Sequence, residues 1–237
     1  MRRLLIIVVI VLVAIVIAAD RIGAVVGAHV LAGKVQNFEH LPHRPSASIN
    51  GVPFLTQAFG GKYNNVHITA HEVPVNQVPV TTLDVTMHGV HLPFSKALHG
   101  SVSQVPVDRA NGTAFVSFAD ANSYLAKHPV GGQTVRLSPG SGGASVNVTG
   151  QIRVKGKTAN LHGVGLLERP VGNVVTIAVS QLRGAGTIPH GFPARATVRL
   201  PLRGLPFRLQ LSSVRASVAG LTGTGGATNI VLGSSVR

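Results

Sequence analysis

An uninterrupted apolar segment at the start of the chain is the feature that most limits where the rest of the chain can fold and act. Arg2 and Arg3 are followed by sixteen residues, Leu4 to Ala19, without one polar side chain, and then by Asp20. Arginines ahead of an apolar run keep that end in the cytoplasm, so the bulk of the chain is expected to be translocated. We therefore expect an exported protein rather than a cytosolic enzyme.

The length of this segment fits two fates. With sixteen apolar residues, the segment has the length of either a long signal-peptide core or a short membrane-spanning helix. Val16 to Ala19 offers small residues for a signal peptidase, whereas an apolar stripe at helical spacing continues towards Gln36 without a proline. Residues 1–19 are therefore predicted to be a signal peptide or a transmembrane anchor, which leaves the protein anchored at the outer face of the cytoplasmic membrane or released into the periplasm.

The rest of the chain, residues 20–237, is predicted to form a single domain. The Gly- and Pro-rich segment 129–145 marks either a subdomain boundary or a long hairpin loop. Charged residues are only 12% and aromatic residues 4%, so aliphatic residues dominate. This surplus of apolar residues is expected to line a cavity or face a membrane, or to form a larger core. The absence of cysteine excludes disulfides and a lipid-modified cysteine.

Basic residues are concentrated in the C-terminal part of the chain. The net charge is +14, and residues 151–237 contain eleven Lys and Arg against one acid, Glu168. This imbalance predicts an anionic partner, which outside the cytoplasm means phospholipid headgroups or acidic wall polymers. Nucleic acid is not expected, because two tyrosines and no tryptophan provide no platform for stacking bases.

Alternation of apolar and polar residues predicts a β-rich protein beyond residue 46. Strands are predicted at 46–49, 66–70 and 82–92 and at seven places between 144 and 232, the fifth of them at 207–211. Residues 118–128 are the exception, a short helix capped by Ser117 and closed by Pro129. The predicted fold class is β-rich α+β, with an antiparallel sheet that is strongly curled or closed.

No residue pattern indicates catalysis or metal binding. At strand spacing, His67 and His71 lie about 13 Å apart. His88 and His91 point to opposite faces of a strand unless a bulge at Gly89 changes the alternation. No serine lies in Gly-x-Ser-x-Gly, and the glycine-rich loop lacks the lysine of a phosphate-binding loop. We therefore predict no enzyme, no catalytic residues, no metal and no cofactor.

Three stretches resemble one family. They are Arg2-Arg3 with the apolar run and Ala19-Asp20-Arg21; Gly51 to Gln57 followed by Gly61 to Val66; and Val214 to Val218 with Leu221 to Gly225. In order and spacing they resemble the actinobacterial cell-envelope proteins of the LmeA type. The resemblance implies an exported phospholipid-binding protein, linked to phosphoinositide-type lipids, in which a long curled sheet wraps one long helix and encloses an apolar cavity, as in tubular lipid-binding folds. It brings no catalytic motif, and this chain is more basic and richer in histidine than the family leads us to expect.

Together these observations favour non-catalytic binding or transfer of anionic membrane phospholipid in the cell envelope. Phe54, Leu55 and Phe59 are predicted to lie at the mouth or wall of the cavity. Arg199, Arg203 and Arg208 alternate with apolar residues and are predicted to contact the lipid headgroup. The alternative is a structural or adhesion module with a filled core, which binds an anionic wall polymer through its basic face. The sequence identifies no protein partner.

Overall fold

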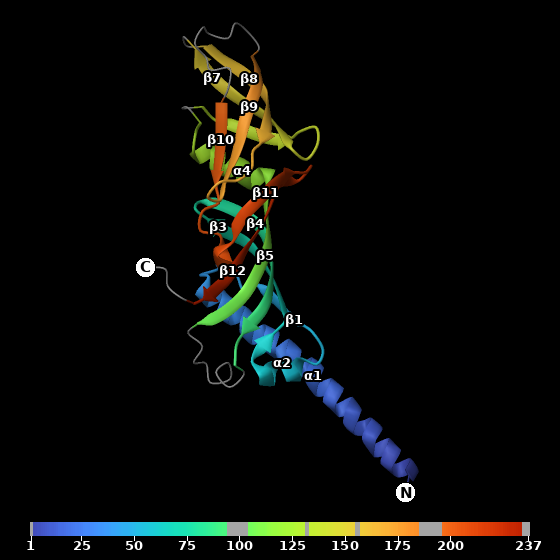
Figure 1. The fold of residues 1–237 in the computed structure, drawn as a ribbon. Helices are drawn as coiled ribbons and strands as arrows, with labels where there is room; N and C mark the ends of the chain where they lie inside the picture. Colours follow the sequence, from blue (N-terminus) through green and yellow to red (C-terminus); the bar gives the residue numbers. More distant parts are fainter. Residues whose placement is uncertain (1, 94–103, 131–132, 155–156, 185–195, 234–237) are drawn as a thin grey trace. The chain divides into compact units, whose positions relative to one another are not determined.

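The computed structural model describes residues 2–93, 104–130, 133–154, 157–184 and 196–233 (Figure 1). Strands dominate, and the fold is of the predicted β-rich class, with a strongly curled, half-barrel antiparallel sheet. The chain forms two compact units. The first comprises Met1–Ala70, Asp84–Ala110 and Thr228–Arg237, and the second His71–Leu83 and Asn111–Ala227. The Gly- and Pro-rich segment 129–145 lies inside the second unit.

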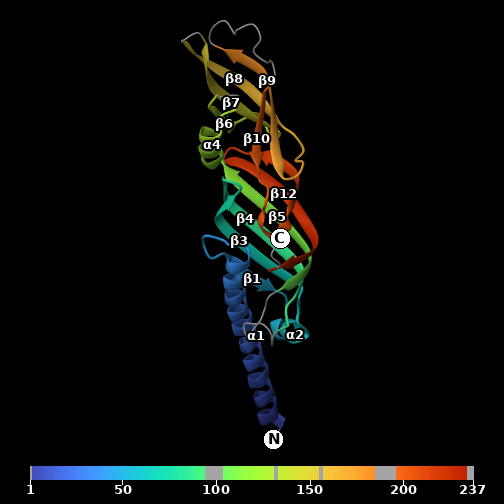
Figure 2. The same ribbon diagram turned by 90° about the vertical axis from the view of Figure 1, so that its left-hand side faces the viewer.

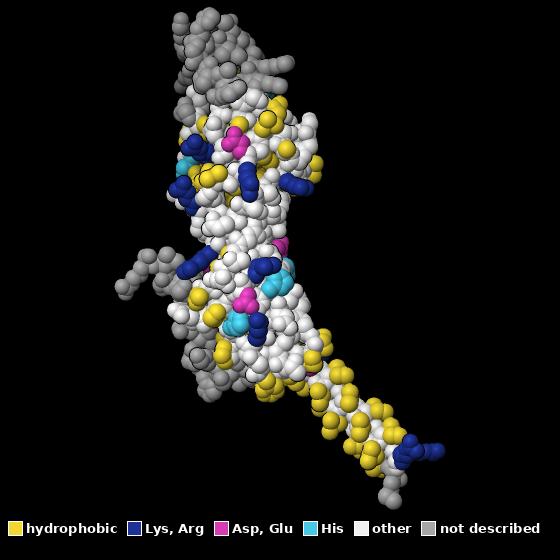
Figure 3. All heavy atoms as spheres, in the orientation of Figure 1, with side chains coloured by type: hydrophobic (Ala, Val, Ile, Leu, Met, Phe, Trp, Pro, Cys, Tyr) yellow, Lys and Arg dark blue, Asp and Glu magenta, His cyan; other side chains and the backbone are white. Residues whose placement is uncertain are grey.

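The first unit is built on one long helix, α1 (Arg2–Phe38), as the proline-free apolar pattern predicts. The N-terminal half of α1 projects from the sheet, and its large apolar side chains from Leu4 to Ile17 are 48–71% exposed (Figures 2 and 3). Asp20 is the first buried residue, and Leu31, Ala32 and Val35 are buried further on. By length and composition α1 is able to cross a membrane.

One curled sheet contains most of the strands of the first unit. Its order among the described residues is β1 (Ser46–Asn50), β3 (Asn65–Val75), β4 (Val78–His91), β5 (Val105–Ser117), β12 (Gly220–Leu232) and β11 (Gln210–Ala216), and β2 (Lys62–Tyr63) pairs with β4. Ser46 faces Thr69, and Asn50 faces Asn65, in the antiparallel β1–β3 pair. The predicted alternation along β4 is confirmed, because Leu83, Val85 and Met87 are buried.

A second sheet lies within the second unit. Its order is β10 (Ala196–Pro201), β9 (Val174–Gly184), β8 (Lys157–Leu167), β7 (Ser145–Val154) and β6 (Val135–Pro139). The predicted helix is present as α4 (Phe118–Lys127), and the Ser117 hydroxyl accepts a hydrogen bond from the Asp120 N–H at 3.0 Å. The Asn122 amide holds α4 against β6, because it bonds both the N–H and the C=O of Leu137.

Two local predictions were wrong, and one short helix was not predicted. Residues 54–60 form that helix, α2 (Phe54–Gly60), whose seven residues are too few to show a helical period. Residues 135–139, placed in a loop by their Gly and Pro neighbours, form β6. Residues 207–211 are not a strand: η1 (Pro206–Arg208) is a 3₁₀ turn, with φ of 60° at Phe207, and β11 begins only at Gln210. Burial still alternates there, so the apolar pattern is the same as that of a strand.

Candidate functional site

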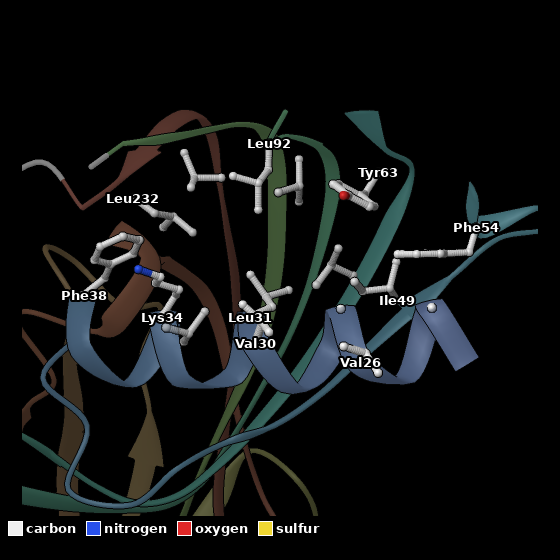
Figure 4. A pocket seen from close by; sticks show the side chains of 16 residues that line it. Val26, Val30, Leu31, Lys34, Phe38, Ile49, Phe54, Tyr63, Leu92 and Leu232 are labelled. Atoms are coloured by element: carbon white, nitrogen blue, oxygen red, sulfur yellow. The ribbon is translucent and has the colours of Figure 1, made fainter. Parts of the chain in front are cut away.

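The first unit contains an apolar cavity of about 420 Å³ between α1 and the arch of the sheet (Figure 4). Its wall is made by sixteen residues from α1, α2, the segment after β4 and strands β1 to β5 and β12. Lys34 is the only charged residue among the sixteen. The volume lies in the range of small-molecule pockets, roughly 300–1,000 Å³, and the lining suits an apolar ligand with a small anionic group.

One face of α1 forms the floor of this cavity. Eight lining residues come from the helix between Gly23 and Phe38, at intervals of three and four, which places them on a single side. At 1.5 Å per residue this stretch of floor is about 22 Å long. Val26 and Val30 belong to it but are 57% and 44% exposed, so the cavity opens to solvent along this edge of the helix.

Phe54, the first residue of α2, closes one end of the cavity. Its side chain is 2% exposed, and its ring centroid lies 6.0 Å from that of Tyr63. The ring rests on two glycines of α1, because a Cβ added at Gly23 or Gly27 would lie 3.1 Å or 3.0 Å from ring carbons. Gly23 and Gly27 therefore provide the space in which the Phe54 ring sits.

Asp20 attaches α2 to α1. Its carboxylate accepts a hydrogen bond of 2.8 Å from the N–H of Leu55, in the first turn of α2. Pro53, which precedes this helix, makes no side-chain cap, so Asp20 satisfies an N-terminal N–H from 35 residues away. From the middle of α2, the Gln57 side-chain oxygen accepts a hydrogen bond of 2.9 Å from the N–H of Asn64. These bonds determine where Phe54 meets the cavity.

The end of the cavity opposite Phe54 contains the charged group, the ammonium of Lys34. Figure 4 places Lys34 and Phe38 there, with the Lys34 ammonium beside the Phe38 ring. Tyr63 contributes a hydroxyl to the wall nearer Phe54, and burial raises the pKa of this phenol. Tyr63 therefore stays neutral and can donate a hydrogen bond. The cavity thus has an aromatic, uncharged end and a cationic end.

The residues predicted from the sequence lie in different places. Phe54 lines the cavity, whereas Leu55 is half-buried outside the lining and Phe59 is 82% exposed. The arginines at 199, 203 and 208 are exposed residues of the second unit, on β10, after it and in η1. The α1 residues of the floor were missed as ligand contacts. Their spacing gave a signal, because it continues the apolar stripe beyond residue 20.

Several histidines of the first unit bond to other side chains. His91 Nε2 is 2.9 Å from Asp108 Oδ1, and Lys62 Nζ is 3.1 Å from Asp108 Oδ2. These two hydrogen bonds, from His91 first and Lys62 second, lower the pKa of the Asp108 carboxyl. His67 bonds Thr86 through Nδ1. Among the described residues, no group of three or more His, Cys, Asp or Glu is placed to hold a metal ion.

The family model of LmeA-like phospholipid-binding proteins matches residues 18–226. The chain belongs to this LmeA-like family. The match starts two residues before Asp20 and includes the α1 floor, α2 and the arch of the sheet, so the cavity lies almost wholly within it. The resemblance seen in the sequence is thereby confirmed. No curated protein and no solved structure matches the chain significantly.

Proposed function

We propose that this LmeA-like protein is exported, remains at the membrane, and binds or transfers an anionic phospholipid in the cell envelope without catalysing a reaction. The apolar cavity of about 420 Å³, with Lys34 at one end, is the main support for this proposal. A wall-polymer adhesion module would be expected to have a filled core in its place. The cavity therefore favours a lipid carrier over the adhesion alternative.

The dimensions of the cavity suit an acyl chain. The hydrocarbon core of a bilayer is about 30 Å thick, so one leaflet holds chains about 15 Å long. The floor of α1 from Gly23 to Phe38, about 22 Å long, accommodates such a chain lengthwise. A chain that moves from a bilayer into this cavity leaves one apolar environment for another, so the free-energy difference is small. Uptake and release are then both accessible, as a carrier requires.

Two sets of cations support the preference for an anionic headgroup. Lys34 is positioned to meet the phosphate of a lipid whose chain points towards Phe54. Arg199, Arg203 and Arg208 are the proposed contacts with headgroups of the membrane, since each basic residue near an anionic surface contributes about 1 kcal/mol. They belong to the second unit, so their role is in membrane attraction rather than in the cavity.

A pair of tryptophan variants on α1 tests the proposal. Val30 lines the cavity, whereas Val25, 71% exposed on the same helix, does not. We expect wild type purified gently from membranes to carry phospholipid in native mass spectrometry. Val30→Trp should carry several-fold less, because the indole fills the opening, while Val25→Trp should match wild type. Lipid-free wild type, or equal lipid in both variants, would overturn the proposal.

A further inference from the structure

Two apolar side chains stand out from the surface of the first unit beside α1. Val52, in the turn before α2, is 73% exposed, and Phe59, near the end of α2, is 82% exposed. The other side of α2 is buried through Phe54, Gln57 and Ala58. Single exposed apolar residues are common on proteins, so exposure alone indicates no partner.

The position of α2 along α1 identifies the partner. The Asp20 carboxylate bonds the Leu55 N–H, so α2 lies against α1 directly after the apolar run that ends at Ala19. Figures 1 and 2 both show α2 where the helix leaves the sheet. Because α1 is one continuous helix, a bilayer that holds residues 4–19 has its outer surface at this level.

The length of the apolar run also places the outer surface of the bilayer close to α2. From Leu4 to Ala19 the helix rises about 22 Å, which is shorter than the hydrocarbon core of about 30 Å. The mismatch draws the next turn of α1 towards the hydrocarbon, where Ile22 and Val25 are 65% and 71% exposed. The exposed Arg21 side chain of that turn is long enough to extend to the headgroups. Asp20 lies at the same level but is only 4% exposed, so lipid does not meet its carboxylate.

We propose that residues 51–60 form a membrane-docking tip, in which Val52 and Phe59 enter the outer leaflet beside α1. The partner is the lipid bilayer itself. This inference rests on the proposed membrane association but needs no lipid in the cavity. Docking of the tip brings Phe54, which closes one end of the cavity and belongs to the same short helix, to the surface of the leaflet.

The absence of tryptophan from the chain provides a direct test. The full-length Phe59→Trp variant is placed in vesicles of equal parts phosphatidylglycerol and phosphatidylcholine, with or without bromine on the acyl chains. Val218→Trp is the matched control, because Val218 is 86% exposed in the second unit and lies at the opposite end of β11 from Arg208. We expect brominated lipid to reduce Phe59→Trp emission roughly twofold, as for aromatic rings at a membrane interface, and to leave the control unchanged.

Two outcomes would overturn the docking tip: no quenching of Phe59→Trp, or equal quenching of both variants. Native mass spectrometry of the same Phe59→Trp sample separates this result from the cavity proposal. Bound phospholipid without quenching rejects the tip and keeps the cavity. Quenching without bound phospholipid rejects the cavity and keeps the tip. Because Phe59 is 82% exposed, its replacement is not expected to prevent folding.

Discussion

Replacement of Gly27 by alanine tests whether the Phe54 ring packs closely against this glycine of α1. Alanine is favoured over glycine inside a helix by about 1 kcal/mol. The new Cβ, however, would lie 3.0 Å from Phe54 Cζ, closer than the usual carbon contact of about 3.5–4.0 Å. The ring has little room to retreat, because Tyr63 and Gly23 flank it. Overpacking of this kind costs about 1–3 kcal/mol, so the variant should be destabilised by up to about 2 kcal/mol.

Gly33→Ala provides the matched control on the same helix. There the new Cβ would meet Arg44 Nη2 at 3.2 Å. This nitrogen donates a hydrogen bond of 2.6 Å to the His29 C=O, but it is the end of an exposed side chain and has more room to move than the buried Phe54 ring. The gain in helix propensity is common to both variants, so their difference isolates the cost of displacing Phe54. We expect Gly33→Ala to be the more stable by about 1–3 kcal/mol in the free energy of unfolding. Urea unfolding of the full chain in one detergent, followed by circular dichroism, measures it. Equal stability of the two variants would refute the close packing of the Phe54 ring against Gly27.

Two further predictions concern charge. Lys34→Glu should lower the ratio of anionic to zwitterionic phospholipid that co-purifies. Reversal of the charges of Arg199, Arg203 and Arg208 should weaken binding to anionic vesicles and leave that ratio unchanged. If Lys34→Glu changed only vesicle binding and the arginine variant changed only the ratio, the two proposed roles would be exchanged. The lowered pKa of Asp108 means that its ion pair stabilises the fold above the unfolded pKa of about 4 and that this contribution is lost as pH falls through the folded pKa. Asp108→Asn should therefore lower the melting temperature more at pH 6 than at pH 3, and an equal effect at both pH values would contradict this.

Local patterns predicted much of the fold. The proline-free apolar run predicted α1, and the hydroxyl of Ser117 predicted the start of α4, because both signals lie within a few residues of the structure they specify. Alternation predicted β3 and β4 for the same reason. The exception at 207–211 is instructive. A 3₁₀ turn followed by extended backbone buries alternate residues just as a strand does.

The candidate site was predicted only in part, because α2 was not recognised. The prediction placed Phe54, Leu55 and Phe59 together at the mouth or wall of one cavity. In a helix, each residue is rotated by 100°, so five steps from Phe54 to Phe59 turn the side chain by about 140°. One ring therefore closes the cavity and the other faces outward. The helix is held by Asp20, a partner 35 residues from Leu55, which no local pattern reveals.

The sequence alone determined that a helix able to cross a membrane precedes a β-rich, basic chain with more apolar residues than one core needs. Those properties depend on composition and on neighbouring residues. Only the tertiary structure decided where the surplus lies, because the cavity wall combines α1 with Phe54, Val105 and Leu232, which are brought together by the curl of the sheet. Two glycines of α1 and one buried carboxylate determine how that cavity ends, through contacts that form only after the chain has folded.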